Sequence, residues 1–308
     1  MSLSINTNTS SMVALETLNA TQSQLSATEN AVSTGKKVAN ASDGPASFGI
    51  ASQMNGNISG QSAVNDGLSY ASSVVSSTNT ASNQILSVLA EIQNAVTSIG
   101  NNSGSKTSLS QINDEINGYL GQIDTIANGA TTNGVNLLAG KTDTTLAITA
   151  SSLQYVTGLQ GSLATVTNFS GITNSTGGSI TADASLSVML GLAKTGAAGT
   201  NTVTGTITTA GTLSQSQLQS AISTIQAAIT TMTNFTSQLG NNTKQIANLT
   251  TFGQSVSDNL TTGVGALTDA DMSAESAKLT SLQTKQSLAI KSLSIANGQS
   301  QNILSLFQ

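Results

Sequence analysis

The chain of 308 residues is 37% apolar, 7% charged and 3% aromatic, carries a net charge of −5, and contains neither Cys nor His. A thiol nucleophile, a disulfide, a Cys/His metal site and an imidazole base are therefore excluded, and we expect neither an enzyme nor a cofactor. Every basic residue is Lys, so no Arg can grip phosphate or base edges, and the negative charge also argues against nucleic acid. No stretch of about 18 apolar residues occurs, so we expect no membrane span.

The N-terminal segment carries a weak helical pattern. Its positions at heptad spacing are Leu15, Leu18, Gln22, Leu25, Glu29 and Val32. After it, Lys36 and Lys37 are expected in a solvated turn, with contact to a partner as the alternative. Pro45 follows Asp43 and Gly44, and it is expected at the first position of the next helix.

Residues 64–99 carry the strongest helical signal. Steps of four and three alternate without a slip through Val64, Leu68, Ala71, Val75, Thr78, Ser82, Ile85, Leu89, Ile92, Val96 and Ile99. A Gly- and Asn-rich run at 100–104 ends this helix. A second helical run follows through Leu109, Ile112, Ile116, Leu120, Ile123 and Ile126. Because the loop is short, the two helices are expected to form an antiparallel hairpin.

Residues 141–212 have a different character. They hold few charges and many Thr, Gly, Ala and Ser residues. Alternating pieces at 145–150 (TLAITA) and 201–210 (NTVTGTITTA) predict short β-strands joined by Gly turns.

Helical periodicity returns at Leu213 and continues to the end of the chain. It first runs through Leu218, Ile222, Ile225, Ile229, Met232, Phe235 or Thr236, Leu239, Ile246, Leu249, Val256 and Leu260. From about Asp269 a further heptad runs through Leu279, Leu282, Gln286, Ala289, Leu293, Ala296, Ser300, Ile303 and Phe307.

In sequence order, helical segments at both ends of the chain thus flank two inner helical segments, and these flank a central segment with the pattern of β-strands. The order predicts a mostly α fold: a long antiparallel helical rod or coiled coil of the N- and C-terminal segments, with a small β-rich central insert at its distal end. We expect a terminal domain (1–45 with 267–308), a rod domain (46–140 with 213–266) and a surface-exposed insert (141–212). The rod core is expected to contain Val64, Leu68, Val75, Ile85, Leu89, Ile92, Val96, Ile112, Ile116, Ile123, Ile222, Ile225 and Ile229.

The terminal seams are about half polar or small, so two such helices bury little apolar area together. The chain nevertheless ends in a run that is apolar on more than one face. Our hypothesis is that the terminal helices are loose in the monomer and become ordered on self-association. The expected assembly interface contains Leu15, Leu18, Leu25, Val32, Leu279, Leu282, Leu293, Ile303, Leu304, Leu306 and Phe307.

Several motifs, in this order, resemble those of bacterial flagellin, the subunit of the flagellar filament. They are SINTNTSSMVALETLNATQSQLSATENAVSTGKKV (4–38), ANASDGPASFGIASQM (39–54), NDGLSYASSV (65–74), TTNGVNLLAG (131–140), DADMSAESAKLT (269–280) and SIANGQSQNILSLF (294–307). The resemblance covers about 1–140 and 213–308, and leaves the centre unmatched.

The resemblance implies a non-enzymatic subunit that is exported by the flagellar type III apparatus without signal cleavage. It would polymerise into an extracellular open helical filament for motility. The resemblance also implies an export chaperone, a cap protein and hook–filament junction proteins as partners. Two alternatives stay open: the junction protein itself, which shares the terminal helices, and a secreted coiled-coil adhesin.

Overall fold

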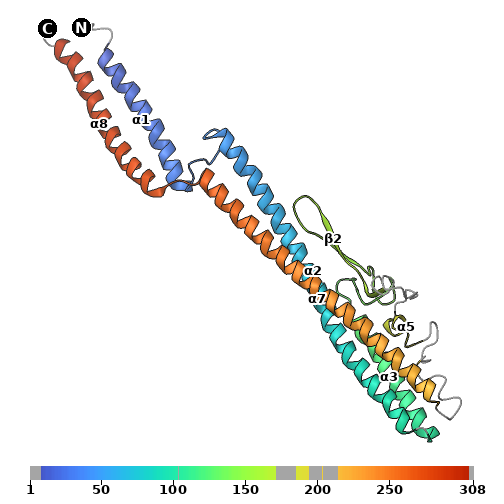
Figure 1. Ribbon diagram of the computed structural model, residues 1–308. Coiled ribbons are helices and arrows are strands. Elements are labelled where there is room, and N and C mark those ends of the chain that lie inside the picture. The colour runs from blue at the N-terminus through green and yellow to red at the C-terminus, as the bar shows by residue number, and fades with distance from the viewer. Residues whose placement is uncertain (1–7, 103, 171–184, 194–202, 204–213, 305–308) are drawn as a thin grey trace. The chain divides into compact units, whose positions relative to one another are not determined.

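The computed structural model describes residues 8–102, 104–170, 185–193, 203 and 214–304, with side chains as far as 298 (Figure 1). The elements in chain order are α1 (Thr9–Thr34), α2 (Pro45–Asn101), α3 (Lys106–Gly129), β1 (Leu153–Val156), β2 (Leu163–Val166), α5 (Leu186–Met189), α7 (Gln215–Thr268) and α8 (Met272–Leu304). The predicted fold class, mostly α with a small β segment in the middle of the chain, is confirmed.

Local signals in the sequence set the helix ends. The Asn8 side chain accepts a hydrogen bond from the Ser11 backbone N–H (3.1 Å) and so caps the start of α1. The same helix ends at Gly35, whose φ of 70° lies in the left-handed region that glycine adopts without strain. Pro45 opens α2, as predicted, because the first turn of a helix needs no N–H donor from that residue.

The chain divides into two compact units. Unit 1 contains Met1–Ser59 and Val256–Gln308, and unit 2 contains Gly60–Ser255. The long helices α2 and α7 each contribute to both units.

In unit 1, α1 (blue) and α8 (red) lie side by side (Figure 1). The segments that lead into and out of this pair are joined by backbone hydrogen bonds. Lys37 N–H donates to the Thr268 carbonyl (2.7 Å), and Ala270 N–H donates to the Gly35 carbonyl (2.9 Å). The Lys37 ammonium also donates to the Ala266 carbonyl (3.0 Å) near the end of α7, where a cation suits the helix dipole. Lys37 is therefore exposed yet bound within its own subunit.

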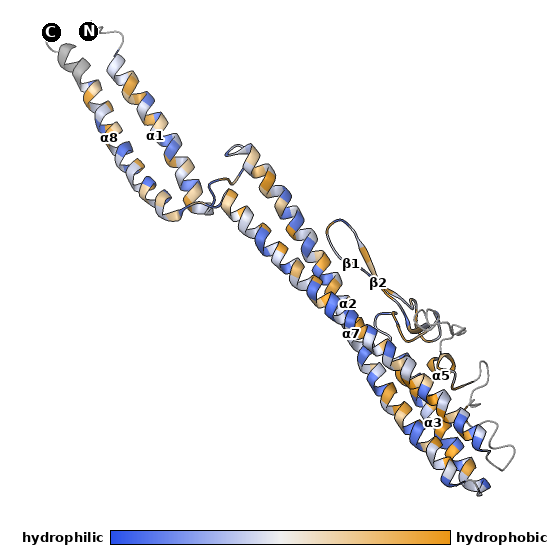
Figure 2. Ribbon diagram, in the orientation of Figure 1, coloured by the Kyte–Doolittle hydropathy of each residue, from blue (hydrophilic) through white to orange (hydrophobic). Residues whose placement is uncertain are grey.

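In unit 2, helices α2, α3 and α7 enclose the main hydrophobic core. The heptad predicted over 64–99 is buried at every position. Figure 2 shows apolar and polar residues alternating along these helices, as expected for amphipathic helices that pack along one face.

The central insert differs from its prediction. The strand expected at 145–150 is wrong: this piece forms a tight turn in which Asp143 and Ile148 exchange backbone hydrogen bonds. The Asp143 carboxylate accepts the Thr145 N–H (2.8 Å), a local bond that competes with extended pairing. The observed strands are β1 and β2, which pair antiparallel with Leu153 opposite Val166 and Val156 opposite Leu163. The strand expected at 201–210 lies outside the described residues apart from Val203.

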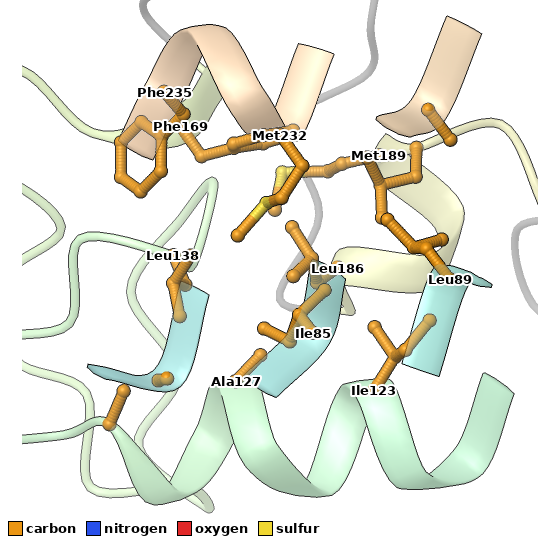
Figure 3. Close-up of a cluster of buried hydrophobic side chains, with 14 of the residues drawn as sticks. Ile85, Leu89, Ile123, Ala127, Leu138, Phe169, Leu186, Met189, Met232 and Phe235 are labelled. Atoms are coloured by element: carbon orange, nitrogen blue, oxygen red, sulfur yellow. The ribbon is translucent and has the colours of Figure 1, made fainter. Parts of the chain in front are cut away.

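Packing joins the insert to the helices of unit 2. The Phe169 ring meets the Phe235 ring of α7 edge to face, with centroids 5.4 Å apart, and Leu138 and Met232 lie beside them (Figure 3). The loop between α3 and β1 is held by buried Asn136, whose amide donates to the Ala127 carbonyl (2.8 Å) and accepts from the Leu138 N–H (2.9 Å). The insert core is therefore continuous with the helical core.

Candidate assembly surface

The seam between α1 and α8 is thin. Its buried residues are Thr21, Leu25 and Thr28 on α1 and Leu282, Ala289 and Ala296 on α8. Only the two leucines among them are large apolar side chains. Because buried apolar area is the main stabilising term, this pair contributes little to the stability of the isolated subunit.

The predicted seam positions agree with the observed burial better on α8 than on α1. On α8 the buried positions fall on the predicted heptad as far as the described side chains extend. On α1, Leu15, Gln22 and Glu29 are exposed, and the buried positions next to them are Thr21 and Thr28. The predicted α1 seam is therefore wrong at these three positions. The prediction started from Leu15 because it is large and apolar, whereas the smaller Ala14, one residue earlier, is the half-buried residue.

Hydrogen bonds reinforce one end of the pair. The Asn8 side-chain amide donates to the Ala296 carbonyl (2.8 Å), and the Ser11 hydroxyl donates to the Asn297 side-chain oxygen (2.8 Å). Nearer the other end, the Thr28 hydroxyl is buried and has no hydrogen-bond partner among the described residues. A buried hydroxyl without a partner destabilises the pair, by about 1–3 kcal/mol.

Large apolar side chains lie on the outside of this pair. They are Met12, Val13 and Leu15 on α1 and Leu288, Ile290 and Ile295 on α8. Ile295 is 72% exposed and Met12 is 65% exposed. Large apolar side chains exposed on two neighbouring helices are typical of a surface that binds another protein or a membrane.

The structure places the predicted interface residues in different surroundings. Leu15 is exposed, Leu25 and Leu282 are buried in the seam, and Leu18, Val32, Leu279 and Leu293 are half-buried. Ile303 and Leu304 belong to α8, but their side chains, like Leu306 and Phe307 as a whole, lie outside the described residues. The predicted set does not contain the exposed residues Met12, Val13, Leu288, Ile290 and Ile295, because heptad spacing selects one seam on each helix. The available signal was apolar residues on both sides of that seam.

The predicted rod-core residues lie together in unit 2. The buried ones are Val64, Leu68, Val75, Ile85, Leu89, Ile92, Val96, Ile116, Ile123 and Ile225. Ile112, Ile222 and Ile229 are half-buried and pack against this cluster.

Two contacts of charged side chains lie on the surfaces of α3 and α8. The Lys278 ammonium lies 3.4 Å from the Glu275 carboxylate one helical turn away. The Tyr119 hydroxyl donates to the Glu115 carboxylate (3.0 Å), and this bond raises the pKa of the tyrosine. Across the described ranges, no group of three or more Asp or Glu residues could hold a metal ion, and no helix is long and apolar enough to cross a membrane.

Comparison with known proteins identifies the family. The bacterial flagellin N-terminal helical region matches residues 5–143, and the flagellin C-terminal helical region matches residues 222–307. Flagellin FljK of Caulobacter vibrioides is 32% identical over 99% of this chain and 98% of its own length. A flagellin of Brucella melitensis is 31% identical over 99% of both chains, and flagellin C of Rhizobium meliloti is 32% identical over the same shares.

Long helices with large exposed apolar side chains are typical of a structural protein that associates with other chains. The chain belongs to the bacterial flagellin family. It is a structural subunit of the extracellular flagellar filament. The relatives named here are all flagellins, which favours this function over a junction protein or an adhesin.

Proposed function

We propose that the subunit polymerises through the terminal pair α1 and α8, whose outer apolar faces are covered by neighbouring subunits. The observation that carries this proposal is the set of exposed large side chains on both helices, Met12, Val13, Leu15, Leu288, Ile290 and Ile295. Each subunit uses the same surfaces, so the contacts repeat along an open helix. Leu306 and Phe307 are proposed to extend this interface at the C-terminus, together with Ile303 and Leu304.

Replacing exposed isoleucines on α8 tests this surface. We expect I290S and I295S each to raise the critical concentration for seeded polymerisation about tenfold or more, because burying one such side chain contributes about 1.5–3 kcal/mol. The measurement is pelleting of filaments from purified subunit after addition of filament fragments.

Gln283 offers a matched control, because it is exposed on the same helix and is polar. Q283S is expected to polymerise at nearly the wild-type critical concentration. Equal critical concentrations for I290S, I295S, Q283S and the wild type would show that these isoleucines stay exposed in the filament.

We further propose that α1 and α8 become fully ordered only on assembly. The thin seam, the unpaired Thr28 hydroxyl noted above and the exposed apolar faces all make the isolated pair weak. Covering two exposed isoleucines contributes about 3 kcal/mol or more, which is about a 100-fold change in an opening equilibrium.

Amide hydrogen exchange measures this ordering. Protection of α1 and α8 is expected to rise about 100-fold or more from monomer to filament, whereas the α2 core around Leu89 is already strongly protected in the monomer. Strong protection of residues 9–34 and 280–304 in the monomer would refute ordering on assembly.

The domain boundaries and the further partner proteins are also proposals. We place the terminal domain at 1–45 with 267–308, the rod domain at 46–140 with 213–266 and the exposed insert at 141–212. An export chaperone, a cap protein and hook–filament junction proteins are proposed as further partners, and catalysis is not part of the proposed role. The exposed apolar faces of α1 and α8 support such partners, since they need covering before assembly.

A further inference from the structure

A pair of polar side chains on α2 packs against α7 where the apolar core of unit 2 ends. From Val64 toward the start of α2, the next buried residue is Gln61, which is 5% exposed. Its amide nitrogen donates to the side-chain oxygen of Asn65, one turn further along the helix (3.2 Å). Gly253 of α7 is buried against these two amides.

Gly253 is required here for space. A Cβ at this position would overlap both the Asn65 Oδ1 and the Gln61 Nε2 atoms, and it would lie 3.3 Å from Asn65 Cγ. Glycine inside a helix is less stable than alanine by about 1 kcal/mol. The close approach of the amide pair therefore accounts for a residue that helix propensity disfavours.

We propose that Gln61, Asn65 and Gly253 form a register clamp that fixes the axial alignment of α2 against α7. If α7 slipped by one turn, Leu249 or Val256 would face the amide pair in place of Gly253. Either side chain would fill the space that the amides occupy and leave buried polar groups without partners. A polar residue at one seam position fixes the register of a coiled coil in the same way, at a cost in stability.

The clamp is separate from assembly. Its three residues belong to unit 2, whereas the exposed apolar faces belong to α1 and α8. The tests below use the full-length monomer, so their outcome does not depend on whether the terminal helices form the filament contacts.

Alanine at two glycines of α7 gives the first test. We expect G253A to lower the thermal unfolding midpoint of the monomer by about 2–4 °C, because the new methyl group separates the two amides. G240A is the matched control, since a Cβ on Gly240 meets nothing within 4 Å. It is expected to raise the midpoint by a similar amount through helix propensity alone. A rise for G253A equal to that for G240A would overturn the clamp.

A second substitution, Q61A, tests whether the effect of G253A depends on Gln61. In a Q61A background Gln61 no longer fills the space beside residue 253. Half-buried Asn65 also loses its hydrogen bond from Gln61, so its side chain can turn away from residue 253 toward water. We expect G253A to cause no drop in the midpoint when it is combined with Q61A. The same drop in both backgrounds would show that Gly253 does not act through Gln61.

A cross-link separates alignment from packing. Met54 and Gly263 lie further along the same two helices, and a Cβ on Gly263 lies 3.5 Å from Met54 Sδ. Because the chain has no Cys, M54C/G263C introduces the only thiols for a short bifunctional thiol reagent. We expect Q61L to keep or raise the unfolding midpoint but to lower the cross-link yield several-fold. An unchanged yield in Q61L would overturn a role in alignment.

Discussion

A subunit that ends at Gly298 is expected to lose the ability to polymerise while unit 2 stays folded. The deletion removes Ile303, Leu304, Leu306 and Phe307, which are a dense apolar group in a chain with only 7% charged residues. If all four side chains are buried between subunits, deleting them makes the free energy of subunit association less favourable by about 6 kcal/mol or more. Each 1.4 kcal/mol is a tenfold change, so filaments should be absent at any practical concentration after seeding.

Two further variants separate the apolar groups from chain length. Deletion of only 303–308 is expected to give the same loss, because all four apolar residues are still removed. A full-length chain with serine at these four positions should also fail to polymerise. Far-UV circular dichroism of each variant is expected to retain the helical signal of unit 2, because residues 60–255 are unchanged. Long filaments from the 303–308 deletion would refute the C-terminal interface.

The helices of unit 2 could be predicted because their signal is local. The heptad from Val64 to Ile99 depends only on which face of one helix is apolar, and the core that α2 shares with α3 and α7 buries the whole of that face. The same reasoning found the α8 seam through Ala296. In both helices, periodicity and burial coincide.

The sequence-based prediction was wrong for the strand at 145–150 and for part of the α1 seam. Residues 145–150 alternate like a strand, but Asp143 binds the Thr145 N–H and forms a turn in their place. On α1 the seam contains Thr21 and Thr28, which hydropathy does not select. A seam of threonine and alanine carries almost no periodic signal, so its register depends on contacts with α8 that the α1 sequence alone does not contain.

The sequence predicted a self-association surface on the terminal helices, and the residues predicted for it differ from most of the large apolar side chains that these helices expose. The half-polar terminal seams indicated self-association, and α1 and α8 do expose large apolar side chains. The sequence assigned the interface to seam residues such as Leu25 and Leu282, which are buried within the subunit. Heptad spacing finds the face that a helix turns toward one neighbour. It does not report apolar side chains that lie on the other sides of the same helix.

Phe235 is expected to be the most costly single truncation in the helical core of unit 2. Its ring is fully buried and meets the Phe169 ring of the insert at an interplanar angle of 79° (Figure 3). Replacement of a buried phenylalanine by alanine costs about 3–5 kcal/mol, because the loss of transfer free energy is added to the cavity left behind. For F235A we expect the unfolding midpoint to fall by about 2–4 °C for each kcal/mol.

Phe252 provides a control with the same chemistry on the same helix. It is 65% exposed, so F252A is expected to change the free energy of unfolding of the monomer by about 0.5 kcal/mol or less. In F235A the insert should also loosen, since Phe169 loses its ring partner while its N–H still donates to the Leu137 carbonyl (2.8 Å). Hydrogen exchange at Leu138 and Phe169 is therefore expected to rise in F235A and to stay unchanged in F252A. Equal stability losses in the two variants would mean that the insert is not anchored to α7 through this aromatic pair.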